Sequence, residues 1–258
     1  MRYRAQGERV FGLSQLKQRL GDGLVAHYIR GGSGNTLFDS SGYGNHADIA
    51  GTVNWTLGQG GDRSCLNFNG TTTIGRTATS PSLTLTNNFT ISFWMKANTL
   101  SDGNRYIIHK ENSGDSAYGI LWEYVNNTIE FYSAFYSGSN PRTGSGIVVD
   151  DLLWHHIAYT YDGVTWSGYK DGVAVFSVAR TFAFSQTGGN LVIGCYSVGN
   201  NVYNGSLDNI TIYNKGLSQA QIWEQSRPFY NPVTQIRRYS NYTAAAPVTD
   251  TSKFFLMF

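Results

Sequence analysis

Trp154-His155-His156-Ile157-Ala158-Tyr159-Thr160-Tyr161-Asp162-Gly163, with Lys170-Asp171-Gly172 seven residues later, is the stretch of sequence that decides the fold. Ile157, Tyr159 and Tyr161 alternate with smaller or polar neighbours, which is the period-two pattern of a β-strand. Each Asp-Gly pair supplies the positive φ that a tight hairpin turn needs, and another alternating strand begins after the second pair. The stretch therefore predicts an antiparallel meander.

Four further segments complete an ordered set of motifs: an opening strand, a long loop, a central strand and a closing strand followed by a short helix. They are Gly23–Tyr28, Asp39–His46, Phe89–Lys96, and Gly205–Asn214 with Leu217 to Ile222. This set resembles the laminin-G-like branch of the concanavalin A-like lectins and glucanases, over roughly residues 23 to 226. The resemblance implies two antiparallel sheets packed as a jelly-roll sandwich. It leaves function open, because that sandwich hosts binding modules, enzymes and scaffolds.

The composition also predicts an all-β protein. The 258 residues are 41% hydrophobic and include 30 glycines, which suits one large sandwich with many turns. Helical periodicity is nearly absent outside the N-terminal segment and residues 217 to 226. The paired Asn126-Asn127 predicts a hairpin turn, because Asn tolerates the left-handed conformation. We expect strands near residues 24–29, 65–69, 89–97, 105–110, 117–125, 128–135, 153–161, 165–170, 173–178, 190–195 and 202–213.

We divide the chain into a docking segment (1–22), the sandwich (23–226) and an extended tail for subunit attachment (227–258). The docking segment has Phe11, Leu13, Leu16 and Leu20 at the spacing of a short amphipathic helix. That helix covers either a partner or one end of its own sandwich. The tail combines aromatic, basic and apolar residues that call for a partner surface. The expected attachment residues are Leu16, Phe229, Tyr230, Arg237, Arg238, Phe254, Phe255 and Phe258.

Charge and hydropathy exclude two classes of partner. The net charge is only +2, and the basic residues are scattered apart from Arg237-Arg238 and the first four residues, so we expect no nucleic-acid binding. Since no apolar run of membrane-spanning or signal-peptide length occurs, we expect neither membrane insertion nor general secretion. Cys65 and Cys195 lie in apolar runs where a thiol packs as a small hydrophobe, and whether they pair is left open.

A catalytic interpretation finds little support in the acidic residues. Glycosidases need two suitably spaced carboxylates, yet the chain has five glutamates and lacks the alternating Glu, Asp and Glu of the glucanases. Glu123 and Glu130 flank the Asn126-Asn127 turn, where ordinary exposed carboxylates are also expected. His155-His156 has no accompanying Gly-x-Ser-x-Gly nucleophile motif. We therefore expect a protein that is not an enzyme.

The resemblance implies a structural Ca²⁺ at the edge of the sandwich. It places Asp39 in the first long loop and Asp208 in the closing strand, with Asn45 as a further oxygen ligand. Asp208 is followed by Asn209 where the family commonly has a second acid, which removes one charge. Alternatively, Asp39 is a turn residue that hydrogen-bonds its own backbone. No Cys or His spacing indicates zinc.

Glycan binding would use exposed aromatic side chains around the central hairpin. The candidates are Trp122, Tyr124, Tyr132, Phe135 and Tyr136. The alternative is that these rings fill the core or cover its rim, because aromatic side chains dominate the packing of sandwiches.

Taken together, these features predict a structural or adhesion component of a phage particle, either a capsid decoration or a tail-associated protein. Its expected location is the virion, with extracellular or cell-surface display as the alternative. The expected partners are other virion proteins, copies of itself and host-surface glycans. The alternatives are a free carbohydrate-binding module and, third, a glycan hydrolase.

Overall fold

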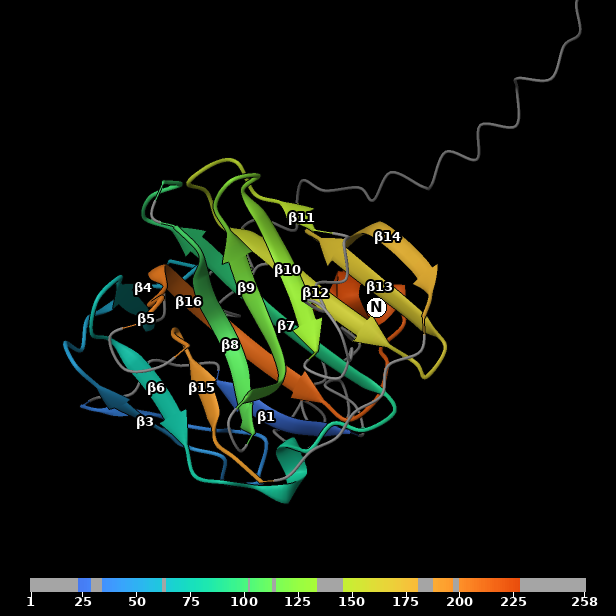
Figure 1. Cartoon of the computed structure of the whole chain (residues 1–258), viewed down its shortest axis with the longest axis horizontal. Helices are drawn as coiled ribbons and strands as arrows, with labels where there is room; N and C mark the ends of the chain where they lie inside the picture. The colour runs from blue at the N-terminus through green and yellow to red at the C-terminus, as the bar shows by residue number, and fades with distance from the viewer. Residues whose placement is uncertain are drawn as a thin grey trace, which may run out of the picture. The chain divides into compact units, whose positions relative to one another are not determined.

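The computed structural model describes residues 23–28, 34–61, 64–101, 103–112, 115–133, 146–180, 188–196 and 200–227. They form two antiparallel β-sheets that face each other (Figure 1), as the sequence predicted. In the first sheet the order is β14 (Val173–Ala179), β13 (Thr165–Lys170), β12 (His155–Tyr161), β7 (Phe89–Ala97), β16 (Asn204–Tyr213), β5 (Ser64–Asn69) and β4 (Trp55–Leu57), with β1 (Leu24–Tyr28) also pairing with β16. In the second sheet it is β11 (Ile147–Val148), β10 (Thr128–Ser133), β9 (Asp115–Glu123), β8 (Arg105–Asn112), β15 (Leu191–Ile193), β6 (Ile74–Thr77), β3 (Ala47–Ala50) and β2 (Thr36–Leu37).

The stretch that opened the sequence analysis forms the meander β12–β13–β14, which joins the rest of the first sheet through β7. The β13–β14 turn has φ of 52° at Asp171 and 80° at Gly172, the two positive values of a tight hairpin. Asn127, with φ of 50°, makes the predicted turn between β9 and β10. Turn chemistry thus fixes the register of both hairpins.

The core between the sheets is built around stacked aromatic rings. Trp166 on β13 lies parallel to Tyr159 on β12, with ring centroids 5.1 Å apart and planes within 4°. From the opposite sheet Phe131 approaches Trp166 to 4.6 Å and Phe89 to 5.4 Å. Large rings such as these dominate the burial of apolar area in a sandwich. This cluster therefore joins the two sheets where the meander crosses β10.

A short helix, α2 (Gln219–Gln225), lies against the outer face of the first sheet (Figure 1). It begins with a capping box, in which Ser218 accepts from the Gln221 backbone N–H and the Gln221 side chain accepts from the Ser218 N–H. Ile222 is fully buried in a small cluster with Ala158 and other apolar residues of the sheet. This is the closing helix that the sequence predicted.

The structure adds strands that the sequence analysis missed and shortens others. The missed strands are β2, β3, β4, β6 and β11, each of two to four residues. Such short strands carry too few residues to show a period-two pattern. β9 ends at Glu123, two residues earlier than expected, and β15 spans Leu191–Ile193 where a strand over 190–195 was expected.

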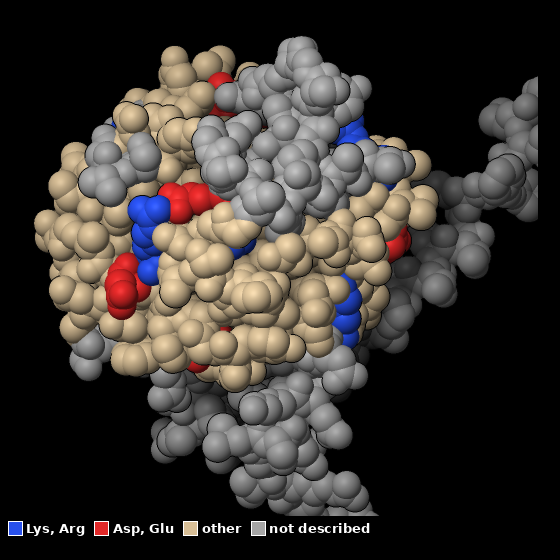
Figure 2. All heavy atoms as spheres, turned by 60° about the horizontal axis from the view of Figure 1, so that its bottom comes forward, with Lys and Arg blue, Asp and Glu red and all other residues tan. Residues whose placement is uncertain are grey.

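Several other expectations can be placed against the described residues. Cys65 and Cys195 are both buried and free, so they do not pair. No helix in the described part of the chain is long and apolar enough to cross a membrane. In the view of Figure 2 the charged side chains among the described residues are few and scattered. The expected docking helix and all of the tail after Arg227 lie outside the described residues.

A small η1 turn (Pro81–Leu83) connects β6 to β7 and places Leu83 in the core. Its neighbour Ser82 accepts a hydrogen bond from the Asn45 side chain, at 2.8 Å. The turn therefore ties the predicted first long loop to the base of the sandwich.

Candidate functional site

Four rings gather on the outer face of the second sheet, and we call them the aromatic face: Tyr106, His109, Tyr132 and Tyr196. Tyr106 is at the centre, with ring centroids 4.9 Å from Tyr196, 5.5 Å from Tyr132 and 5.9 Å from His109. Tyr106 and His109 come from β8, Tyr132 from β10, and Tyr196 follows β15. Three segments distant in sequence therefore build one aromatic surface.

Tyr132 lies flat because a glycine is its cross-strand neighbour. It stands opposite Gly119 on β9, and a Cβ added to Gly119 would lie 2.4 Å from the Tyr132 ring. The same glycine stands opposite His109 on the other side. Any larger residue at this position would force the ring away from the sheet. Gly119 therefore makes the space in which Tyr132 rests between β10 and β8.

His109 contributes a neutral ring to this surface. Its Nδ1 lies 3.0 Å from the carbonyl oxygen of Cys195, which only a protonated nitrogen can satisfy by donating. Burial lowers the pKa of His109 to about 4, so the ring carries no charge near neutral pH. It stacks on Tyr196 at 5.4 Å with planes 25° apart. The buried His109 ring thus supports the more exposed ring of Tyr196 by stacking on it.

Charged groups border the aromatic face on its β6 side. Val192 stands opposite His109 on one side and opposite Arg76 on the other. Arg76 binds Glu111 through two contacts of 2.7 Å and 2.5 Å. Both side chains are partly exposed, at 44% and 27%. The ion pair therefore offers donors and acceptors within two strands of the rings.

The aromatic side chains differ in access. Tyr196 is 37% exposed, while Tyr132 is 8% and His109 is 2% exposed. Tyr106 is half-buried. The surface thus has an open side at Tyr196 and Tyr106 and a more enclosed side at Tyr132.

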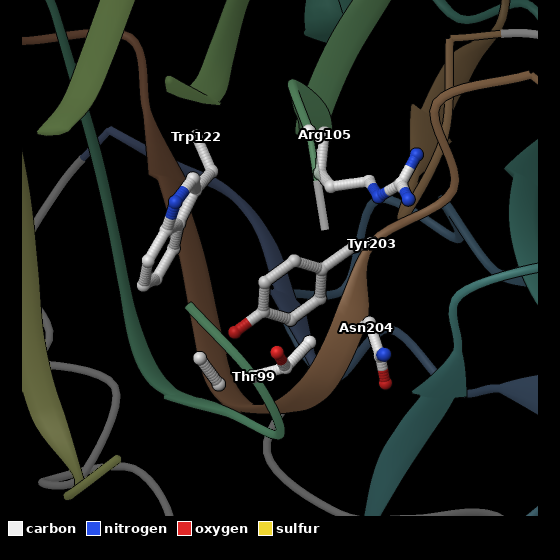
Figure 3. Close-up of a pocket in the computed structure, with 7 residues that line it drawn as sticks. Thr99, Arg105, Trp122, Tyr203 and Asn204 are labelled. Atoms are coloured by element: carbon white, nitrogen blue, oxygen red, sulfur yellow. The ribbon is translucent and has the colours of Figure 1, made fainter. Parts of the chain in front are cut away.

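A small pocket lies beside this surface, at the end of the sandwich where β8 begins (Figure 3). It is lined by Ala97, Thr99, Gly103, Arg105, Trp122, Tyr203 and Asn204. The space between these side chains is about that of one water molecule. In Figure 3 the Tyr203 hydroxyl points towards the side where Trp122 and Thr99 lie, and it has no hydrogen-bond partner among the described residues. The pocket is too small to be the main site, although Arg105 joins it to Tyr106 along β8.

The predicted glycan-binding residues are scattered rather than gathered. Trp122 is 3% exposed and belongs to the core, because it alternates along β9 with outward-facing residues. Tyr124 is 46% exposed in the β9–β10 turn. Tyr132 alone belongs to the aromatic face, and Phe135 and Tyr136 lie outside the described residues. The prediction that Trp122 is an exposed glycan-binding residue is therefore wrong, because its side chain lies in the core.

Asp39 organises the first long loop. Its Oδ1 accepts from the backbone N–H groups of His27 and Ser41, and its Oδ2 accepts from the Ser41 hydroxyl and the Asn45 N–H, all at 2.8–2.9 Å. The Ser41 contact is the local turn bond that the alternative interpretation predicted. Each carboxylate oxygen thus accepts two hydrogen bonds, which hold the loop in place.

Asp208 belongs to a different network. Its Oδ2 accepts from the Gln59 backbone N–H at 3.0 Å. In the described part of the chain, no three His, Cys, Asp or Glu side chains gather in a way that could hold a metal ion. Calcium binding at Asp39, Asn45 and Asp208 stays a prediction, which a Ca²⁺ titration would test.

Glu123 is engaged in its own turn. Its carboxylate accepts from the backbone N–H groups of Val125 and Asn126, at 3.2 Å and 3.0 Å, and from the Asn126 amide. Glu130 lies on β10, where it stands opposite Leu121. Since Glu123 stands opposite Thr128, the two glutamates are diagonal neighbours on the hairpin. Glu123 is thereby committed to holding the turn that the sequence predicted.

The remaining predicted residues concern subunit attachment. Leu16, Phe229, Tyr230, Arg237, Arg238, Phe254, Phe255 and Phe258 all lie outside the described residues.

The two-sheet sandwich with an aromatic outer face defines a lectin-like protein. Residues 68–223 match the Laminin_G_3 family model, described as the concanavalin A-like lectin/glucanases superfamily, and the chain belongs to that family. The match confirms the resemblance that the sequence motifs indicated. A comparison with curated proteins gave no match.

Solved structures with the same fold have diverse roles. Domain 4 of AbnA, a GH43 extracellular arabinanase from Geobacillus stearothermophilus in complex with arabinotriose, is 20% identical with a TM-score of 0.63. The similarity covers 80% of this chain and 98% of that domain. The binding domain of Paraclostridial Mosquitocidal Protein 1 is 16% identical with a TM-score of 0.67, covering 82% of this chain and 53% of that one.

A third similar structure is the Trypanosoma rangeli sialidase in complex with sialic acid, 16% identical with a TM-score of 0.59. The similarity covers 81% of this chain and 36% of the sialidase, so this chain spans about a third of that protein. At these identities the likeness establishes the fold alone.

Proposed function

We propose that this chain is a non-enzymatic glycan-binding module whose ligand lies on the aromatic face. The observation that carries the proposal is the packing of Tyr106, His109, Tyr132 and Tyr196 into one surface on the outside of the second sheet. Sugar rings present apolar C–H faces that pack on flat aromatic rings. Tyr196 and the half-buried Tyr106 are the rings of this surface that are open to such a ligand, and His109 and Tyr132 pack beside Tyr106.

The charge state of the surface supports a neutral or weakly polar ligand. His109 is uncharged near neutral pH, because burial keeps its pKa at about 4. The Arg76–Glu111 pair presents both signs of charge within one contact. Hydroxyl groups can donate to the carboxylate and accept from the guanidinium. A neutral oligosaccharide therefore suits the site better than a polyanion.

Known structures support the same class of ligand. The similar AbnA domain was solved with arabinotriose, although it shares only 20% identity with this chain. The proposal for this chain rests on its own rings rather than on that likeness.

The test is binding of the full chain to a panel of neutral oligosaccharides, followed by titration calorimetry with the best ligand. Tyr196→Ala should weaken binding about tenfold, since a lost ring contact is worth about 1.4 kcal/mol. Tyr43→Ala is the matched control, because Tyr43 is 57% exposed in the first long loop. Absence of saturable binding, or equal losses in both variants, would contradict the proposal.

The same preparation tests the absence of catalysis. Glu123 is occupied by its turn, which leaves Glu130 as the remaining carboxylate of the predicted pair. We expect no release of reducing sugar from any glycan that binds. Turnover that Glu130→Gln abolishes while binding persists would assign the chain to the hydrolases instead.

We also propose that the module is displayed on a phage particle, as a capsid decoration or a tail-associated protein. This assignment is supported by the sequence alone: a lectin-like domain followed by a tail with Pro228-Phe229, Arg237-Arg238 and an apolar end. Deleting residues 227–258 should abolish incorporation into particles while the sandwich stays folded. Equal incorporation of the truncated chain would remove the virion assignment and leave the free module.

A further inference from the structure

β14 is a long, apolar strand whose outer edge pairs with no other described strand. It ends the first sheet, pairs only with β13 among the described strands, and has seven residues. Six of those residues are exposed, including Val173 at 61%, Val175 at 49% and Val178 at 39%. Its outer-edge backbone groups therefore face no strand of the described part of the chain, and its valine side chains are exposed.

The other described sheet edges differ from β14. β4 has three residues, and β11 and β2 have two each. β1 has five residues, but all except Leu24 are buried. Proteins commonly protect sheet edges by keeping the edge strands short, charged, interrupted by proline, bulged or covered. β14 is thus the edge with the most to offer a partner strand.

The sequence of β14 contains none of the usual chemical deterrents to edge pairing. Val173–Ala179 reads Val-Ala-Val-Phe-Ser-Val-Ala, with no charged residue and no proline. A bulge between Gly168 and Tyr169 of β13 leaves Val175 as the extra residue of β14. Beyond it, Phe176 to Ala179 pair regularly with β13, so a regular stretch of edge is available.

An exposed tryptophan extends this apolar edge. Trp223 of α2 is 52% exposed, and a Cβ added to Gly172 would lie 2.7 Å from its ring. Gly172 directly precedes Val173, so Trp223 and the start of β14 form one apolar surface. Contiguous apolar surface of this kind marks interaction sites on soluble proteins.

We propose that β14 pairs antiparallel with β14 of a second copy of this chain, joining two first sheets into one continuous sheet. The same strand on both sides makes the interface self-complementary about a two-fold axis. In that arrangement the start of one strand lies beside the end of the other. Asp171 precedes the strand and Arg180 follows it, so opposite charges lie at the two ends of the pair. The Asp171 carboxylate also accepts from the His156 backbone N–H and contacts His155 Nδ1, and its side chain stays 45% exposed.

A second copy accounts for these features better than an unrelated peptide does. The opposite charges at the two ends favour the antiparallel pairing of the strand with itself, whereas they specify nothing about a foreign sequence. The interface uses the first sheet and the aromatic face uses the second, so the dimer is independent of the proposed glycan site. A dimer would present two aromatic faces and gain avidity for a repeating ligand.

The test is the mass of the full chain, measured by light scattering over a concentration series. We expect the mass of a dimer, or of a larger assembly built from dimers, and we expect Val175→Lys to halve that mass. Val125→Lys is the matched control, because Val125 is 68% exposed in the β9–β10 turn. We expect at least a tenfold rise in the dimer dissociation constant for Val175→Lys and no change for Val125→Lys.

Circular dichroism must show that both variants fold. If Val175→Lys does not fold, Val173→Lys serves in its place, and hydrogen exchange of the Phe176–Ala179 amides is compared at high and low protein concentration. A monomer at every concentration overturns the proposal. An assembly whose mass is unchanged by both Val175→Lys and Val173→Lys overturns it as well. Loss of glycan binding with the dimer intact would count against the aromatic face alone.

Discussion

The outer faces of the two sheets each place a buried histidine beside an aromatic ring, with different results. On the first sheet, the His156 ring lies 5.5 Å from the Trp94 ring, and the side-chain nitrogens of both find no hydrogen-bond partner in the described part of the chain. On the second sheet, His109 contacts the Cys195 carbonyl and stacks on the partly exposed Tyr196. The first pair is closed, with His156 1% and Trp94 5% exposed.

This difference shows that the presence of aromatic residues on a sheet face does not by itself indicate a binding site. The Trp94–His156 pair gives up hydrogen bonds to be buried, which costs about 1–3 kcal/mol for each unsatisfied group. The His109–Tyr196 pair is satisfied on its inner side and keeps a ring at the surface. A ligand site is therefore indicated by a ring that stays exposed, as Tyr196 does, on a neighbour whose inner nitrogen is hydrogen-bonded, as Nδ1 of His109 is.

The largest expected effect is the loss of folding stability on acidification, to which both buried histidines contribute. Burial lowers the pKa of His156 to about 3 and that of His109 to about 4, against an ordinary value of 6.5. Both rings are neutral in the folded chain, while the unfolded chain takes up protons below pH 6.5. Stability is therefore fully present above pH 6.5 and falls as the pH drops towards 4. Each histidine should contribute about 2–3 kcal/mol of this loss between pH 7 and pH 4.5.

The measurement is urea unfolding at the two pH values for the wild type, His156→Leu and His109→Gln. Each variant should lose less stability on acidification than the wild type. At pH 7 the two variants should differ in their free energy of unfolding. His156→Leu should cost little stability, because it removes two ring nitrogens that lack described partners. A pH 7 destabilisation by His156→Leu of several kcal/mol would show that the first face is satisfied after all.

A substitution at Gly119 should have a smaller effect that is specific to the second face. Gly119→Ala places a methyl group 2.4 Å from the Tyr132 ring, which must move. We expect about 1–3 kcal/mol of lost stability from overpacking, together with weaker glycan binding. Gly188→Ala is the control, since its nearest contact would be an ordinary 3.5 Å. Thermal unfolding and calorimetry of both variants would check this, and unchanged binding by Gly119→Ala would separate Tyr132 from the site.

The smallest expected effect concerns the border of the aromatic face. Arg76→Met breaks a partly exposed ion pair with Glu111, so stability should change by less than about 1 kcal/mol. Affinity for the glycan should fall about threefold if the guanidinium binds a hydroxyl. Asp162→Asn, in the β12–β13 turn, is a comparison outside the site for the same calorimetric titration. Equal affinities for all three proteins would confine the ligand to the rings.

The sequence predicted the hairpins and the closing helix because their signals are local. Asp171-Gly172 and Asn127 have the positive φ values that their residue types indicated, and Ser218 with Gln221 makes the capping box that begins α2. These features depend on neighbours within four positions of the chain, which a sequence displays directly.

The aromatic face was largely missed for a physical reason. Tyr106 and His109 are three residues apart, so a regular strand would place them on opposite faces. The β8–β9 pairing shifts register between Tyr106 and Ile108, and that bulge brings both rings to the same side. Trp122 was misplaced because Ile120, Leu121 and Trp122 are all apolar, and such a run does not show which side is the core.

The burial of the two cysteines has a practical consequence for chemical labelling. Burial raises the pKa of both Cys65 and Cys195 to about 12, so almost no thiolate exists at neutral pH. Maleimide reagents react with the thiolate and should leave the native chain nearly unmodified. A single cysteine introduced at an exposed position such as Val125 would then carry a fluorophore alone, without removal of either native thiol.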